Sequence, residues 1–193
     1  MPWEKNFDLD KATDKAIQVF WKKGYEGTSM SDLIDAMGIN KGSLYNAFGS
    51  KDELFNRALL RYDQLNRQEA LKQLSKLEDP KQVVATFFDG MISETLKDKE
   101  HKGCFLVNTA LDLPNQSDEI KKMVSAALKE LEDFFIAIIS KGQKVGTIET
   151  TKNAREIAVA MVALIVGLRV LARGTYSSKN LEAIKTQALH LLS

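Results

Sequence analysis

The sequence has only one cysteine, three prolines and two histidines among its 193 residues. A single cysteine excludes an intramolecular disulfide framework and fits a reducing compartment. There is no Cys-x-x-Cys or His-x-x-x-His spacing, no glycine-rich phosphate loop after a strand, and no acid and base paired at a suggestive spacing. We therefore expect no metal site, no cofactor and no enzymatic activity.

Long hydrophobic runs are also missing. The longest one, Ile157 to Ala172, contains Arg169 and is shorter than the roughly 20 residues that cross a bilayer. The N-terminal stretch MPWEKNFDLD carries acids and no apolar run, which excludes a secretory or transit signal. These features predict a cytoplasmic protein that does not enter the membrane.

Charge of one sign is not in excess either. Lys and Arg number 27 against 26 Asp and Glu, a net charge of +1 that identifies no partner. The distribution is more informative, because no acid occurs from Ala36 to Lys51, while Lys41 and Lys51 bracket the segment. A local positive surface is expected there.

Helical periodicity is abundant. Nearly every segment between glycine or proline breaks repeats apolar residues at three- and four-residue spacing, which predicts an all-α protein. The last hundred residues supply most of the hydrophobic core. About nine helices are expected, at residues 8–23, 29–37, 40–48, 51–77, 81–98, 103–112, 117–143, 153–173 and 178–192.

A short Gly-containing turn, MGIN at residues 37–40, joins the second and third of these helices. Two helices joined in this way form a helix-turn-helix, whose second helix enters the DNA major groove. On a helical wheel, Leu44 and Phe48 share the side that faces the other helices. A helical bundle of any function can contain short polar helices and Gly turns, so the pattern alone leaves DNA binding open.

The opposite side of this short helix carries Gly42, Ser43, Tyr45 and Asn46. Small side chains let the backbone approach base edges, and Ser and Asn can exchange hydrogen bonds with them. Glycine inside a helix costs about 0.5–1 kcal/mol relative to alanine, which suggests that Gly42 approaches a partner closely. Four further residues lie where helix N-termini favour phosphate, namely Thr28, Ser29, Lys41 and Lys51.

Residues 24–55 read GY-x-x-TSM-x-DL-x-x-AMGINKGSLYNAFGSKDELF. This order closely resembles the N-terminal domain of the TetR family of transcriptional regulators, and the match extends without a gap from residue 8 to about 60. The resemblance implies phosphate contacts from Thr28, Tyr45 and Lys51. It also implies major-groove contacts from Lys41, Gly42, Ser43 and Asn46.

One departure from the family pattern affects base preference. Many relatives follow the tyrosine with an aromatic residue and a histidine, where this chain has Asn46 and Ala47. The operator sequence therefore cannot be carried over. The resemblance implies a helix-turn-helix DNA-binding domain at residues 1–50 and a helical ligand-binding and dimerisation domain at residues 51–193.

In the second domain, Gly103 to Leu113 resembles a segment of one branch of TetR-like regulators. The resemblance implies a small-molecule pocket and a homodimer through the last two long helices. The helix around Ala158 to Leu171 supports the dimer independently, because it is apolar over most of its circumference, with small residues at Ala158, Ala163 and Gly167. A helix at the centre of a monomeric bundle is the alternative.

Cys104 allows two interpretations. Relatives with Gly-Cys here include regulators thought to sense electrophiles, and the nearby His101, Lys102 and helix start favour a reactive thiol. A lone cysteine beside Phe105 is, however, most often a small core residue. Five further residues could line an apolar pocket or fill the core, namely Phe87, Phe88, Met91, Phe134 and Phe135. For Arg169 we expect a carboxylate of the second subunit more than a ligand carboxylate.

The sequence thus predicts a ligand-responsive DNA-binding transcriptional regulator. Its partners are a double-stranded, palindromic operator, bound by a dimer, and a small-molecule effector of unknown identity. A small-molecule or electrophile inducer releases this repressor by moving the fourth helix and changing the separation of the two DNA-reading heads. A helical adaptor without regulated DNA binding is the alternative.

Overall fold

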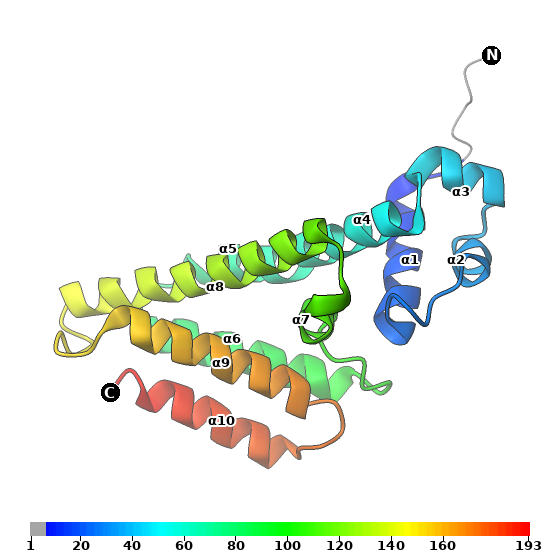
Figure 1. Ribbon diagram of the computed structural model, residues 1–193. Coiled ribbons are helices and arrows are strands. Elements are labelled where there is room, and N and C mark those ends of the chain that lie inside the picture. The colour runs from blue at the N-terminus through cyan, green and yellow to red at the C-terminus, as the bar shows by residue number, and fades with distance from the viewer. Residues whose placement is uncertain (1–6) are drawn as a thin grey trace.

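The computed structural model describes residues 7–193, and every regular element in that part of the chain is a helix (Figure 1). This confirms the all-α prediction. The α-helices are α1 (Leu9–Lys23), α2 (Met30–Met37), α3 (Lys41–Phe48), α4 (Lys51–Asp63), α5 (Glu69–Leu74), α6 (Pro80–Lys97), α7 (Phe105–Leu111), α8 (Asp118–Lys144), α9 (Ala154–Leu171) and α10 (Ser178–His190).

The single helix expected at residues 51–77 is α4 and α5, joined by a π-helical segment, Gln64–Gln68. Counted as one, these two bring the α-helices of residues 7–193 to the nine expected. A short 3-10 turn, Leu113–Asn115, precedes α8. The loop that contains Gly146 to Thr150 forms turns rather than a strand.

Side chains at the helix starts explain the boundaries of the N-terminal helices. Ser29 begins α2 and Ser50 begins α4, each in a capping box with the acid three residues later. Asn40 begins α3 by accepting a hydrogen bond from the Ser43 amide. Gly38, in the left-handed conformation, ends α2, as the glycine in MGIN predicts.

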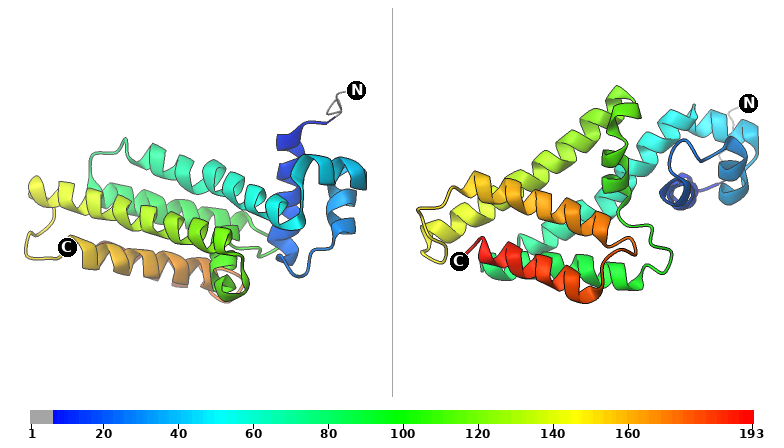
Figure 2. Two further views of the ribbon diagram at one scale, coloured as in Figure 1. Left: turned by 45° about the horizontal axis from the view of Figure 1, so that its top comes forward. Right: turned by 60° about the horizontal axis from the view of Figure 1, so that its bottom comes forward.

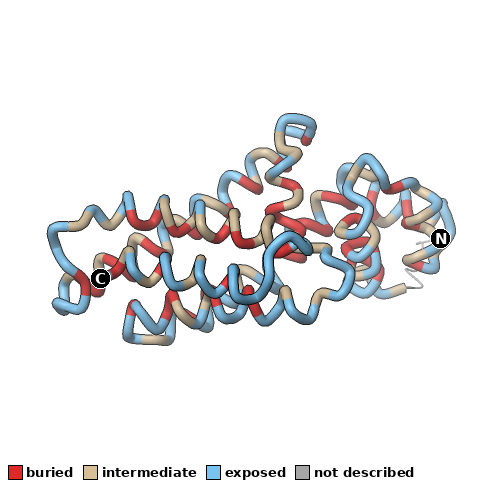
Figure 3. The backbone as a smooth tube through the Cα atoms, turned by 90° about the horizontal axis from the view of Figure 1, so that it is seen from below, coloured by how far each residue is buried: buried red, intermediate tan, exposed pale blue. Residues whose placement is uncertain are grey.

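The molecule is elongated (Figures 1 and 2). Helices α1–α3 lie at one end and are called the head. Helices α6, α9 and α10 stack at the other end, in the part that we call the body. Buried residues follow the lines where neighbouring helices meet (Figure 3). One core joins α1–α4 to α7 and the start of α8. A second core joins α6, the remainder of α8, α9 and α10. Helix α4 therefore leads from the N-terminal head into the body.

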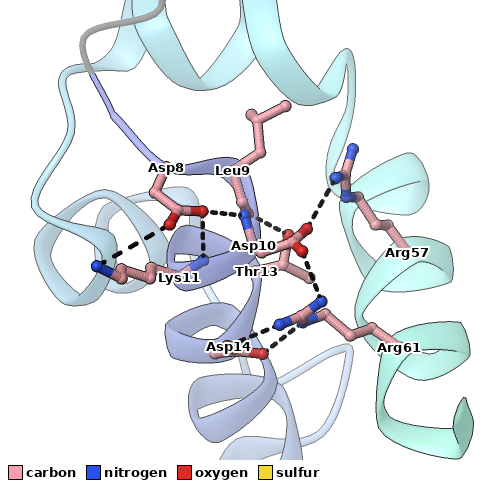
Figure 4. A network of polar contacts seen from close by, with 8 residues as sticks. All are labelled: Asp8, Leu9, Asp10, Lys11, Thr13, Asp14, Arg57 and Arg61. Atoms are coloured by element: carbon pink, nitrogen blue, oxygen red, sulfur yellow. Dashed lines mark hydrogen bonds and ion pairs between the residues drawn. The ribbon is translucent and has the colours of Figure 1, made fainter. Parts of the chain in front are cut away.

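An ion-pair network fastens α4 to α1 (Figure 4). The Arg61 guanidinium donates to both carboxylate oxygens of Asp14, at 2.5 and 3.0 Å, and lies 3.0 Å from Asp10. Arg57 lies 3.6 Å from the same Asp10 carboxylate. Two arginines of α4 thus pair with acids of α1, in addition to the hydrophobic core that the two helices share.

In residues 7–193 we find no helix that is both long and apolar enough to span a membrane.

Candidate nucleic-acid interface and effector cavity

Helix α3 is held from one side only. Leu44 is fully buried and Phe48 is 5% exposed, as the helical wheel predicts. The Phe48 ring lies 6.4 Å from that of Phe7, and the Arg57 guanidinium lies 5.6 Å above it. These contacts fix α3 to the rest of the head and leave the opposite side of α3 open.

The open side of α3 carries Lys41, Gly42, Tyr45 and Asn46, all of them exposed, with Ser43 half-buried beside them. Tyr45 is 43% exposed and does not belong to the hydrophobic core of the head. The Lys41 ammonium lies 6.0 Å from its ring. We name this surface, formed by residues 41, 42, 43, 45 and 46, the reading face.

Gly42 is not required by the packing of the head. A Cβ placed there would meet only the Asn40 side-chain oxygen, at 3.4 Å, an ordinary contact distance. The backbone at this position also has an ordinary helical conformation. The lack of a side chain therefore leaves an open approach to the start of α3, as close contact with DNA requires.

Lys51, the first residue of α4, is supported by a tyrosine. Its ammonium lies 4.2 Å from the centre of the Tyr25 ring. Tyr25 donates its hydroxyl hydrogen to the Asp52 carboxylate. Burial and then this hydrogen bond raise the pKa of Tyr25 to about 12, so the phenol stays neutral near pH 7. Tyr25 was not among the expected site residues, although its place in the Gly-Tyr element was a signal.

The position of Thr28 differs from the expectation. Its side chain is buried, with the residue 2% exposed, and its hydroxyl donates to the Gly24 carbonyl at 2.6 Å. The structure therefore does not support a phosphate contact from this side chain. The hydroxyl instead closes the turn between α1 and α2, because it satisfies a carbonyl at the end of α1.

Ser29 is exposed, but both its amide and its hydroxyl hydrogen-bond to the Asp32 carboxylate, at 2.9 and 2.8 Å. The Lys23 ammonium lies 2.6 Å from the same carboxylate. These contacts, that of Lys23 foremost, lower the pKa of Asp32 to about 2. The amide and the hydroxyl of Ser29 are thus both engaged in the N-terminal cap of α2. A contact of Ser29 with DNA would have to compete with this cap.

A cavity of about 130 Å³ lies among α4, the π-helical segment, α6, α7, α8 and α9. Most of its wall is apolar, including Phe87, Met91 and Leu131. A more open, polar cleft of about 490 Å³ adjoins it on the side of α1. The two share four wall residues, Tyr62, Asn66, Glu94 and Arg169. We name the first the inner cavity and the second the outer cleft.

Cys104 precedes α7 and lines the inner cavity. It is half-buried, and its Sγ accepts a hydrogen bond from the Tyr62 hydroxyl at 3.7 Å. Burial raises the pKa of Tyr62, which keeps this donor protonated. Lys102 is engaged elsewhere, since its ammonium lies 4.7 Å from the centre of the Trp21 ring and 3.2 Å from the Gln18 amide oxygen.

The expected pocket residues divide into two groups. Phe87 and Met91 line the inner cavity, whereas Phe88, Phe134 and Phe135 do not. Phe88 and Phe135 are completely buried in the second core, and Phe134 packs against that core. Core packing accounts for these three, because helical periodicity does not distinguish the wall of a cavity from a filled interior.

Arg169 has a carboxylate partner within its own chain, where the sequence led us to expect one from the second subunit. Its guanidinium lies 2.7 Å from the Glu94 carboxylate of the same chain, on the wall shared by the inner cavity and the outer cleft. Arg169 belongs to α9 and Glu94 to α6. Their pairing could not be predicted from the sequence because the two residues are far apart in the chain.

Helix α9 turns an apolar side away from the core. Val159 is 50% exposed, Ala163 is exposed, and a Cβ added at Gly167 would meet nothing within 4 Å. Beside it, a groove of about 400 Å³ lies between α9 and α10, lined by Leu164 and Ile184 among others. Ala158 does not belong to this surface because it is fully buried in the second core.

The part of the chain that the structure describes contains no group of three or more His, Cys, Asp or Glu side chains placed to hold a metal ion.

Comparisons with known proteins agree with this arrangement. Residues 12–58 match the family model described as bacterial regulatory proteins, tetR family. Residues 80–188, more than half of the chain, match the model of the tetracyclin repressor-like C-terminal domain. The two models cover the head with most of α4 and the body from α6 to α10.

Among curated proteins, the chain is 28% identical over 188 residues to the HTH-type transcriptional repressor ComR of Escherichia coli (strain K12), covering 97% of this chain and 90% of ComR. It is 30% identical over 131 residues to the uncharacterized HTH-type transcriptional regulator YezE of Bacillus subtilis (strain 168), covering 68% of each.

Among solved structures, a cysteine mutant of the TetR family transcriptional regulator CifR, complexed with double-strand operator DNA, has a TM-score of 0.85 at 29% identity, covering 97% of this chain and 98% of that one. The reduced form of E. coli NemR has a TM-score of 0.86, covering 95% and 96%, but at 16% identity it bears on the fold alone. The chain belongs to the tetR family of bacterial regulatory proteins, and it is a DNA-binding transcriptional regulator.

Proposed function

We propose that this protein is a repressor that binds a palindromic operator as a homodimer in the cytoplasm and leaves it when an effector occupies the inner cavity. The exposed reading face carries the proposal. Residues 1–50 act as the DNA-binding domain, and residues 51–193 bind the effector and the second subunit. CifR, 29% identical, has been solved on operator DNA, which supports the DNA part of this assignment.

In this proposal Lys41, Gly42, Ser43 and Asn46 approach base edges, while Tyr45 and Lys51 hold phosphates. The reading face supports these roles because its side chains make few contacts within the head. One short helix gives little specificity on its own. Two heads on successive major grooves, about 34 Å apart, multiply it, which explains the need for a dimer.

Replacing Tyr45 tests the reading face. Because the side chain is exposed and packs against no core residue, Tyr45→Ala should leave the melting temperature unchanged. Operator affinity should fall about tenfold, the usual order for one lost contact. Fluorescence anisotropy on DNA flanking the gene measures this, with Val145→Ala, at an exposed apolar residue that ends α8, as the control.

Equal affinity of the Tyr45→Ala variant and the wild type would contradict the proposed face. If the wild type itself showed no sequence-dependent binding at physiological salt, the regulator function would fail and the adaptor alternative would replace it.

The effector side of the proposal rests on the inner cavity, whose wall includes residues of both α4 and α9. A molecule bound there contacts Tyr62 on α4, and α4 is tied to the head by Arg57 and Arg61. Effector binding that favours one position of α4 therefore favours one separation of the two heads, which is what induction requires.

Cys104 is the candidate for an electrophile-sensitive response, because its sulfur lies in the wall of this cavity beside the Tyr62 hydroxyl. If the thiol is the sensor, a quinone should release wild-type protein from the operator but not the Cys104→Ser variant. Operator affinity without the reagent should be equal for both. Release of the two proteins at the same quinone concentration would remove Cys104 from the mechanism.

A further inference from the structure

The size and the side chains of the inner cavity indicate which class of molecule can bind there. This inference rests on the proposed function, in which the cavity binds the effector. The cavity's volume of about 130 Å³ is close to that of an apolar protein cavity known to hold benzene, about 150 Å³. The ligand, or the part of it that enters, is therefore about the size of one six-membered ring. Most of the wall it meets is aliphatic or aromatic.

The charged residues of the wall are already neutralised. Arg67 donates to both oxygens of the buried Asp63 carboxylate, at 2.6 and 2.7 Å, and to Glu130 at 2.6 Å. Arg169 is paired with Glu94. A charged ligand would lose its hydration without gaining an unmatched countercharge, and that exchange is unfavourable.

One hydrogen-bond donor of the wall has no protein acceptor. Arg67 uses its Nε and Nη2 in the contacts with Asp63 and Glu130, but its Nη1 is buried without a partner in residues 7–193. A guanidinium nitrogen can only donate, so the missing partner is an acceptor. Trp21, which lines the outer cleft, likewise has a buried Nε1 donor without a partner in the described chain.

We propose that the effector is a small uncharged molecule with an apolar ring-sized body and a hydrogen-bond acceptor such as a carbonyl oxygen, and that Arg67 is the residue that binds this oxygen. The apolar body occupies the inner cavity against Phe87 and Met91. Substituents of a larger effector extend past Tyr62 and Arg169 into the outer cleft, where Trp21 is the second donor.

The test compares a ketone with a hydrocarbon of the same shape and the same number of heavy atoms, cyclohexanone and methylcyclohexane. Dissociation constants are measured by ligand-observed NMR on the intact protein without DNA. Arg67→Lys keeps a positive charge opposite Asp63 but replaces the three guanidinium nitrogens by one ammonium, so no donor is left in the place of Nη1. It should weaken cyclohexanone about tenfold, the effect of losing a hydrogen bond to a charged donor, and leave methylcyclohexane within about twofold.

The matched control is Arg155→Lys, the same substitution at an exposed position of α9, which should change neither constant. If Arg67→Lys does not fold, the double variant Asp63→Leu with Arg67→Met removes the pair together and should show the same selective loss of cyclohexanone. Cyclohexanecarboxylate and cyclohexylammonium should not displace cyclohexanone.

Equal weakening of ketone and hydrocarbon, or tighter binding of the carboxylate than of the ketone, would overturn the assignment. Because the measurement contains no DNA, a failure of operator binding in the anisotropy assay would count against the proposed function alone and leave this result standing.

Discussion

Lys51, which we propose to hold a phosphate, is positioned by neighbouring side chains of the same chain. Lys51 is half-buried, and its ammonium lies over the Tyr25 ring. Tyr25 is in turn oriented by Asp52 through its hydroxyl. A lysine held in this way loses less side-chain freedom on meeting a phosphate than a free surface lysine does.

Lys51→Ala should weaken binding to operator and to unrelated DNA alike. Each phosphate contact contributes about one unit to the slope of log affinity against log salt concentration, so the slope should fall by about one. Tyr25→Leu keeps the charge of Lys51 but removes the aromatic ring below its ammonium. DNA affinity should fall by a smaller factor than in Lys51→Ala, and the salt slope should not change. The control is Lys141→Ala, an exposed lysine at the far end of α8. An unchanged slope in the Lys51→Ala variant would exclude its phosphate contact.

At the scale of residues, burial could be predicted where helical periodicity determines it, but not where a particular hydrogen bond determines the position of a side chain. Leu44 and Phe48 could be placed inside because their spacing puts them on one side of α3. The inward turn of Thr28 could not be predicted, since it depends on the position of the Gly24 carbonyl. The partner of Arg169 lies on another helix, 75 positions earlier in the chain, at Glu94 (169 − 94 = 75).

The junction between α3 and α4 is the element-scale feature on which the interface depends. Gly49 connects the two helices with φ = 72°, and a Cβ there would overlap the Glu53 carboxylate. That carboxylate accepts the Ser50 amide hydrogen in the capping box that begins α4. Gly49 thus permits both the turn and the cap that orient α3 relative to Lys51.

Gly49→Ala should therefore lower the free energy of unfolding by more than the cost of placing an alanine at positive φ. Gly146→Ala is the matched control, because Gly146 has φ = 77° and nothing within 4 Å of an added Cβ. We expect a cost of about 1–2 kcal/mol at Gly146 and about 1 kcal/mol more at Gly49, from the lost cap. Urea unfolding followed by circular dichroism measures both. Equal costs would show that the capping box tolerates the displacement.

At the scale of elements, caps and breaks placed nearly every boundary, because Ser, Asn and Gly act through the backbone groups next to them. The π-helical segment Gln64–Gln68 was missed since its residues continue the helical spacing on both sides. This irregular turn contains Arg67, follows α4 directly and contributes Asn66 and Arg67 to the wall of the inner cavity.

In the whole molecule, α4 is the helix that connects the inner cavity to the head. It shares one core with the head and α7, and its C-terminal end borders the inner cavity. The route from Tyr62 along α4 to Arg57 and Arg61 is continuous, and it ends on the acids of α1. A ligand-induced shift of α4 changes DNA affinity only if two heads are linked in one particle, since a single head is free to follow its DNA.

The dimer can be tested at Gly167 without disturbing the protomer. A Cβ added there meets nothing within 4 Å in its own chain, and Leu is favoured over Gly in a helix by about 1 kcal/mol. Gly167→Leu should therefore fold normally yet separate the subunits at micromolar concentration, as should Ala163→Glu, because both alter the open side of α9. Ala126→Glu, at an exposed position of α8, serves as the control.

Sedimentation velocity gives the subunit state of each variant, and anisotropy gives its operator affinity. Loss of the dimer should reduce specific binding at least about a hundredfold, because one head contacts only one half-site. Binding to unrelated DNA should change far less, since each head keeps its own phosphate contacts. A Gly167→Leu protein that stays dimeric would place the interface on another surface, and a monomer with full operator affinity would show that one head suffices.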